Sequence, residues 1–197
     1  MLTHDIHQFD AVLITHEHND HIIGVDDIRP FNFAQGRDMP FYALPRVINE
    51  LENRFAYVFS KNAYPGAPRI NAQAIHPGQI LRLGDLEVEC LPITHGKLDI
   101  LGFKIHGFVY ITDASQISDE VINKIKNCKV LVLNALHRRP HHSHFNLEQA
   151  LYHAKLIQAE QTYFTHLSHF MGLHEEVSKE LPEKVSLAYD ALSLIIP

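Results

Sequence analysis

Cysteine is scarce in this chain of 197 residues, and tryptophan is absent. The two cysteines, Cys90 and Cys128, lie far apart and do not form a CxxC pair. A framework of disulfide bonds is therefore not expected. Because cysteines in a reducing compartment stay unpaired, the cytoplasm is the predicted location.

Two further features are missing: an excess of positive charge, and an apolar run of membrane-spanning length. The formal net charge is −6, which speaks against a general nucleic-acid binder, because such proteins carry a basic stripe. A small anionic substrate is still compatible with that charge, since bound metal ions outweigh net charge locally. No partner membrane is predicted.

Histidine, by contrast, is abundant. The chain has 16 histidines beside 17 lysines and arginines. Neutral imidazole is the commonest metal-ligating side chain, but a solvated histidine-rich surface gives the same composition. The spacing of the histidines must therefore distinguish the two interpretations.

We find no repeats or linker-like segments, so the sequence predicts a single domain over residues 1–197. Strands alternate first with turns and later with helices, which indicates a mixed α/β fold. We expect an irregular segment over 53–69. The expected strands are 9–15, 40–44, 72–75, 80–83, 86–91, 101–105, 108–112, 130–133 and 161–165, followed by two short closing strands. The expected helices are 45–55, 118–126 with Ser118 as cap, 147–159 capped by Asn146 and Gln149, and 174–181.

The densest histidine cluster follows the first apolar strand and reads His16-Glu17-His18-Asn19-Asp20-His21. On extended backbone His16 and His18 point the same way, and Asp20 and His21 lie just beyond. Imidazole and carboxylate together suit Zn²⁺, Mn²⁺ or Fe. A merely polar turn is the alternative. Thr15 and Asn19 are expected to support the ligands or the turn.

Three more residues of ligand type come directly after apolar strands. His95 follows the strand ending near Leu91, Asp113 follows 108–112, and His166 follows 161–165. One such histidine is more often an ordinary loop residue. The recurrence of the pattern predicts a metal site at one edge of the sheet, where ligands collect in such folds.

The motifs HxHxDH, PxTHG, YxTDAS and YFTHLSH, together with RPHHSHFNLEQA over 139–150, resemble those of the metallo-β-lactamase superfamily. Within it, the chain is most similar to the PhnP-like cyclic-phosphate phosphodiesterases, which are related to tRNase Z. The resemblance implies an αββα sandwich. It also implies a hydrolase that acts on a small anionic phosphodiester.

The resemblance further implies two divalent ions, zinc or manganese, with iron as a third choice. His16, His18 and His95 would hold one ion. Asp20, His21 and His166 would hold the other, and Asp113 would bridge both. His144 and Asp20 are the implied catalytic residues, with His144 donating a proton to the leaving alkoxide or binding a phosphate oxygen. His141 and His142 are expected either at the surface or in contact with substrate.

The chain departs from the family pattern at its start, where only about ten residues precede the first strand. We therefore expect the sandwich to lack the first part of its N-terminal half. An exposed sheet edge favours association. The sequence thus predicts a homodimer paired across that edge, or a marginally stable protein.

Other functions remain open on the same residues. The site would also suit hydrolysis of a thioester, a lactone or a β-lactam. Processing of tRNA 3′ ends is disfavoured by the acidic net charge and the absence of a long basic insertion. Because fold does not fix function, binding of metal or ligand without turnover is a further alternative.

Overall fold

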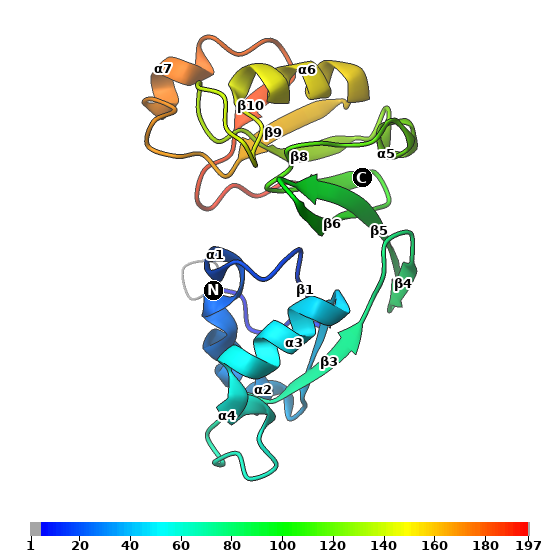
Figure 1. Cartoon of the computed structure of the whole chain (residues 1–197), viewed down its shortest axis with the longest axis vertical. Helices are drawn as coiled ribbons and strands as arrows, with labels where there is room; N and C mark the ends of the chain where they lie inside the picture. Colours follow the sequence, from blue (N-terminus) through cyan, green and yellow to red (C-terminus); the bar gives the residue numbers. More distant parts are fainter. Residues whose placement is uncertain (1–4, 197) are drawn as a thin grey trace. The chain divides into compact units, whose positions relative to one another are not determined.

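The computed structural model describes residues 5–196 (Figure 1). The chain divides into two compact units, Met1–Gln79 and Ile80–Pro197. We describe each unit by itself. The expectation of a single domain over residues 1–197 stays a prediction.

The first unit is built on a three-stranded parallel sheet in the order β1-β2-β3. Its strands are β1 (Val12–Leu13), β2 (Met39–Ala43) and β3 (Ile70–Ala74). The first strand is shorter than the expected 9–15. The reason lies at Phe9, whose backbone N–H and C=O bond the side chain of Gln35 at 3.1 and 3.0 Å. The backbone of Phe9 therefore needs no hydrogen bonds from a neighbouring strand.

Helices occupy most of the remaining first unit, and several of them were not expected. No helix was expected in the segment after the histidine cluster, but it is helical almost throughout. A further short helix lies in the expected irregular segment 53–69, and the predicted helix over 45–55 is confirmed. The helices are α1 (Asn19–Ile22), a 3-10 helix (Ile23–Ile28), α2 (Arg29–Gln35), α3 (Pro45–Arg54) and α4 (Ala56–Phe59).

A buried amide ties the helical segment to the sheet. The Asn32 side chain donates to the carbonyls of Arg37 and Arg69 at 3.0 and 2.9 Å, and accepts from the Arg69 N–H at 2.9 Å. Gly36 ends α2 with a φ of 66°, a conformation that glycine adopts without steric cost. These contacts fix the point at which the chain leaves α2 and enters β2.

The second unit contains a seven-stranded sheet in the order β10-β9-β8-β7-β6-β5-β4. Strands β4 to β7 form an antiparallel meander, and β7 to β10 are parallel. The strands are β4 (Ile80–Leu83), β5 (Leu86–His95), β6 (Leu98–Ile105), β7 (Phe108–Ile111), β8 (Val130–Asn134), β9 (Gln161–Thr165) and β10 (Val185–Leu187). The expected strands are confirmed, except that one short strand closes the described chain where two were expected.

Helices connect the parallel strands, because such strands need a crossover connection. They are α5 (Asp119–Ile125), α6 (Leu147–Ile157) and α7 (His174–Ser178). The Ser118 side chain accepts from the Val121 N–H, and Asn146 forms a reciprocal capping box with Gln149. Both predicted caps are confirmed.

The direction of the strands determines where the polar side chains of the second unit gather. Because β5 and β7 are both antiparallel to β6, β5 runs in the same direction as β7, β8 and β9. The carboxyl ends of these four strands therefore lie at one edge of the sheet. Beneath that edge the core is apolar, with Leu91, Ile111 and Leu133 fully buried.

The mixed α/β class predicted from the sequence is confirmed, with helices accompanying both sheets. Among the described residues, no helix has the length and apolar character needed to cross a membrane.

Candidate metal centre

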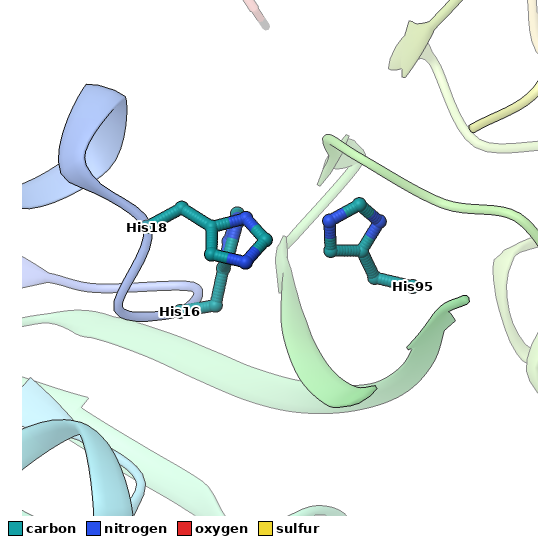
Figure 2. A group of neighbouring side chains, drawn as sticks. All are labelled: His16, His18 and His95. Carbon is teal, nitrogen blue, oxygen red and sulfur yellow. The ribbon is translucent and has the colours of Figure 1, made fainter. Parts of the chain in front are cut away.

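The loop after β1 carries the four predicted ligands of the first unit. His16 Nε2 lies 3.1 Å from His18 Nδ1, and the ring centroids of His16 and His21 are 4.2 Å apart. Figure 2 shows how His16 and His18 project from this loop. Asp20 Oδ2 lies 3.3 Å from His21 Nε2. Three imidazoles and one carboxylate thus converge on one short segment, as the spacing predicts.

Neighbouring polar groups hold the loop. Thr15 Oγ1 lies 3.0 Å from His16 Nδ1, which leaves Nε2 of that ring facing His18. Arg54 of α3 donates to the carbonyl of Glu17 at 3.1 Å and to Asn19 Oδ1 at 2.7 Å. The supporting roles expected for Thr15 and Asn19 are confirmed. Arg54 could not be predicted from the sequence, because nothing in its spacing connects it with the loop.

In the second unit, the predicted ligands lie at the edge where β5, β7 and β9 end. His95 is the last residue of β5 (Figure 2), and it extends a strand that was expected to stop near Leu91. Asp113 and His166 follow β7 and β9 with φ values of 58° and 54°. Non-glycine residues adopt this left-handed conformation at a steric cost, and aspartate and histidine are among those found there most often.

The Asp113 carboxylate is the hub of this edge and is almost completely buried. Its Oδ1 lies 2.9 Å from His144 Nε2 and 3.1 Å from His166 Nε2, while Oδ2 accepts from Thr112 Oγ1 at 2.5 Å. Ligand atoms of His95, Asp113 and His144 all lie within 4.8 Å of one another. Imidazoles gathered around a buried carboxylate form a donor set that suits a divalent transition metal.

Hydrogen bonds from backbone and side-chain groups hold these ligands in place. His95 Nδ1 lies 2.7 Å from the carbonyl oxygen of Ser143, so Nδ1 carries the hydrogen and Nε2 is the nitrogen available to a metal. The buried Asn134 amide accepts from the N–H of Ala114 at 2.7 Å and donates to the Ala114 carbonyl at 3.0 Å. Asn134 thereby holds the chain directly after Asp113.

The predicted catalytic His144 lies beside this group and contacts the segment that precedes it. His144 Nδ1 is 3.0 Å from Ser143 Oγ and 3.1 Å from His141 Nδ1. Burial, and then the neighbouring imidazoles of His144 and His142, lower the pKa of His141. His141 therefore remains neutral more readily than a free histidine. His142 is exposed.

A pocket of about 270 Å³ opens beside His166. Its lining combines polar and apolar groups. It is formed by Thr165, His166, Leu167, Ala188, Tyr189 and Asp190. A pocket this small suits part of a small molecule better than a polymer.

Every predicted ligand therefore belongs to one of two clusters. Neither cluster alone supplies the two complete ligand shells that the sequence analysis expects. The first unit holds His16, His18, Asp20 and His21, and the second holds His95, Asp113 and His166 together with His144.

A family profile described as a β-lactamase superfamily domain matches residues 2–167. The chain belongs to this superfamily. A crystal structure of a diphosphatase from the PhnP family aligns with the whole chain and 75% of its own length, with a TM-score of 0.90 and 32% identity. The predicted fold and the resemblance to the PhnP-like branch are thereby confirmed. The short form of human tRNase Z shares the fold, with a TM-score of 0.69 and 16% identity over 98% of this chain and 80% of its own.

Two curated relatives are named for activities other than that of the diphosphatase. An octanoyltransferase of Porphyromonas gingivalis is 40% identical over 192 residues, which cover 97% of this chain and 39% of that protein. An exodeoxyribonuclease of Bacillus anthracis is 26% identical over 137 residues, which cover 68% of this chain and 47% of the relative. The chain thus spans less than half the length of both proteins.

Proposed function

We propose that the chain is a metal-dependent phosphodiesterase that cleaves a small cyclic or nucleotide-like phosphodiester. The observation that carries this proposal is the position of His144, whose Nε2 lies 2.9 Å from the Asp113 carboxylate among residues of ligand type. An acid placed there serves a reaction whose leaving group must be protonated. An alkoxide is such a leaving group, whereas a thiolate leaves without a proton.

The centre that the family resemblance implies would hold two divalent ions, zinc or manganese, with iron as a third choice. His16, His18 and His95 would hold one ion. Asp20, His21 and His166 would hold the other, with Asp113 shared between them. When bound, such ions supply a water of lowered pKa and neutralise charge on the attacked phosphate.

The protein's own groups have distinct tasks in this proposal. Asp113 orients the imidazoles of His144 and His166 through Oδ1, and the Ser143 carbonyl orients His95. Asp20, whose Oδ2 lies 3.3 Å from His21 Nε2, would be the second catalytic residue. His144 gives its Nε2 proton to the departing oxygen as the bond to phosphorus breaks. The superfamily match and the diphosphatase and exodeoxyribonuclease similarities support chemistry at phosphorus.

A second candidate is the hydrolysis of an acyl thioester or ester on the same residues. The 40% identity with an octanoyltransferase favours it, although the aligned part is only 39% of that protein. Lactone and β-lactam hydrolysis belong to the same class of reaction. Binding of metal or ligand without turnover is the remaining alternative.

The experiment is a comparison of substrates on protein loaded with Mn²⁺ or Zn²⁺. We expect turnover of a phosphodiester, and little or none of an octanoyl thioester or a β-lactam. Turnover of the acyl substrates alone would replace the leading proposal with the second one. Two bound ions without any turnover would indicate a binding protein.

A variant tests the role of His144 in the same assay. His144→Ala is expected to lower kcat on the order of a hundredfold while the bound metal stays unchanged. His106→Asn, in the exposed turn between β6 and β7, is the matched control. Loss of metal from His144→Ala would mean that His144 is a ligand.

The homodimer and the cytoplasmic location expected from the sequence stay predictions. Size-exclusion chromatography with light scattering at several protein concentrations tests the first of them. A monomer at every concentration would contradict it.

A further inference from the structure

The segment between β8 and α6 places a second histidine directly behind His144. Its members His141, Ser143 and His144 all belong to the second unit and contact one another. Ser143 Oγ lies 3.3 Å from His141 Nδ1 and 3.0 Å from His144 Nδ1, and the two Nδ1 atoms are 3.1 Å apart. The ring of His144 therefore has a defined group on each side.

The two ring nitrogens of His144 have different surroundings. Nε2 faces the Asp113 carboxylate at 2.9 Å, and Nδ1 faces His141 and Ser143. A histidine that acts as an acid must begin as imidazolium, because a neutral ring that loses its proton becomes imidazolate. Nδ1 therefore carries a hydrogen throughout the step, and this N–H needs an acceptor.

We propose that His141, assisted by the Ser143 hydroxyl, is the positioning residue that accepts the Nδ1–H hydrogen bond of His144. This inference rests on the proposed phosphodiesterase function. Both candidate acceptors lie within hydrogen-bond distance of Nδ1. The bond fixes the direction in which Nε2 presents its proton, and it stabilises the charged ring while that proton is held.

The chemistry of His141 suits an acceptor. A neutral imidazole has one nitrogen with a free lone pair, whereas the protonated ring has none. Burial and the adjacent imidazoles lower the pKa of His141, which favours the neutral ring. His141 thus remains able to accept at Nδ1 when its own hydrogen is on Nε2.

The backbone around these residues is fixed from two directions. The Phe145 N–H donates to the Ala114 carbonyl at 2.7 Å, and the Leu136 N–H donates to the Phe145 carbonyl at 2.9 Å. The Ser143 carbonyl accepts from His95 at 2.7 Å. A segment held in this way keeps the distance between His141 and His144 short.

The step itself balances with water as the second reactant. The water oxygen forms a bond to phosphorus and releases one proton to solvent, and the bond from phosphorus to the leaving oxygen breaks, with its electron pair staying on that oxygen. The Nε2 proton of His144 passes to the leaving oxygen. His144 is left neutral with Nδ1–H still bonded to His141, and a proton from solvent restores the imidazolium.

The test compares leaving groups. A p-nitrophenyl phosphodiester releases a stable phenolate that needs no acid, whereas a methyl or cyclic alkyl phosphodiester releases an alkoxide that does. We expect His141→Ala to lower kcat for the alkyl substrate on the order of tenfold or more relative to the p-nitrophenyl substrate, without a matching change in KM. His141→Asn retains an acceptor oxygen near the position of Nδ1 and should restore most of the difference.

His76→Ala is the control, because His76 is an exposed histidine outside the segment that holds His141 and His144. Its ratio of alkyl to p-nitrophenyl turnover should equal that of the wild type. Metal content and melting temperature are measured for every variant, so that a folding defect is recognised. If His141→Ala does not fold, His141→Asn still tests the inference.

The outcomes separate the inference from the proposed function. If the wild type cleaves neither phosphodiester, the proposed function fails. If the wild type cleaves both, and His141→Ala lowers both equally or neither, the phosphodiesterase stands and the positioning role of His141 is wrong. Failure of His141→Asn to restore the ratio would also overturn that role.

Discussion

Asp113 and His144 are joined by a contact of 2.9 Å between Oδ1 and Nε2, at the carboxyl end of β7. The same oxygen lies 3.1 Å from His166 Nε2. One buried carboxylate thus orients two imidazoles that arrive from different parts of the sequence. Its loss would leave both rings without their shared partner.

Asp113→Asn is therefore expected to weaken metal binding by about tenfold or more and to lower turnover of a phosphodiester at least in proportion. The amide keeps the size of the side chain but removes the negative charge. Metal content by mass spectrometry and activity on the same sample provide the measurement. Asp85→Asn, in the exposed turn between β4 and β5, is the control. Full metal content in Asp113→Asn would contradict the ligand role.

The sequence correctly placed these residues at strand ends, because the signal for that position is local. Each predicted ligand of the second unit lies at or just beyond a strand end, and an apolar strand followed by His or Asp is visible without a structure. His16 and His18 are likewise placed by their spacing alone. The motif resemblance then supplied the assignment of these residues to ions, which stays a prediction.

The end of β5 shows where local reasoning fails. The strand was expected to stop near Leu91. The next residue is Pro92, and proline cannot donate to a ladder. β5 instead continues through Pro92, paired with Leu101, to His95. Its other neighbour, β4, pairs only as far as Glu89. Within the sheet, Pro92 thus lies where β5 is an edge, and proline is tolerated there.

The contacts that support the ligands could not be predicted from the sequence either. Asn134 forms hydrogen bonds with Ala114, which lies 20 positions away in the chain. The Ser143 carbonyl accepts a hydrogen bond from His95, which lies 48 positions away. Neither has a distinctive spacing. Their roles depend on the strand order of the sheet, which brings distant strand ends together.

Gly96 offers a test of the support behind His95. Its φ is +62°, and an added Cβ would lie 3.1 Å from Ser143 Cβ. Gly96→Ala is therefore expected to cost about 1–2 kcal/mol of stability for the left-handed backbone, and also to displace Ser143 and weaken metal binding. The measurements are chemical denaturation and metal titration.

Gly84→Ala is a closely matched control for that variant. Gly84 has a φ of +59°, and nothing lies within 4 Å of its added Cβ. Both variants should lose similar stability from the backbone, but only Gly96→Ala should lose metal affinity. Equal metal binding by the two proteins would show that the contact with Ser143 does not matter.

Asn134→Ala tests the hydrogen bonds that follow Asp113. The substitution leaves a buried N–H and a buried C=O of Ala114 without their partner, which typically costs about 1–3 kcal/mol. We expect a lower melting temperature and reduced turnover. Asn123→Ala, on the exposed face of α5, should change neither. A melting temperature equal to the wild type would mean that water replaces the amide.

The two buried thiols predict how stability depends on alkaline pH. Burial raises the pKa of Cys90 and of Cys128 to about 11, above the ordinary value of 9.0. The unfolded chain therefore loses these protons at lower pH than the folded protein. Their contribution to stability is fully present below pH 9, falls as the pH rises from about 9 to 11, and amounts to roughly 2–3 kcal/mol for each thiol.

The measurement is urea denaturation at a series of pH values from 8 to 11. Tyrosine and lysine also titrate in this range, so the wild type is compared with the double variant Cys90→Ala, Cys128→Ala. The variant should start less stable at pH 8, because it leaves small cavities at two buried positions, and its stability should then fall less steeply with pH. Parallel curves for the two proteins would mean that the thiols ionise at the same pH in the folded and unfolded states.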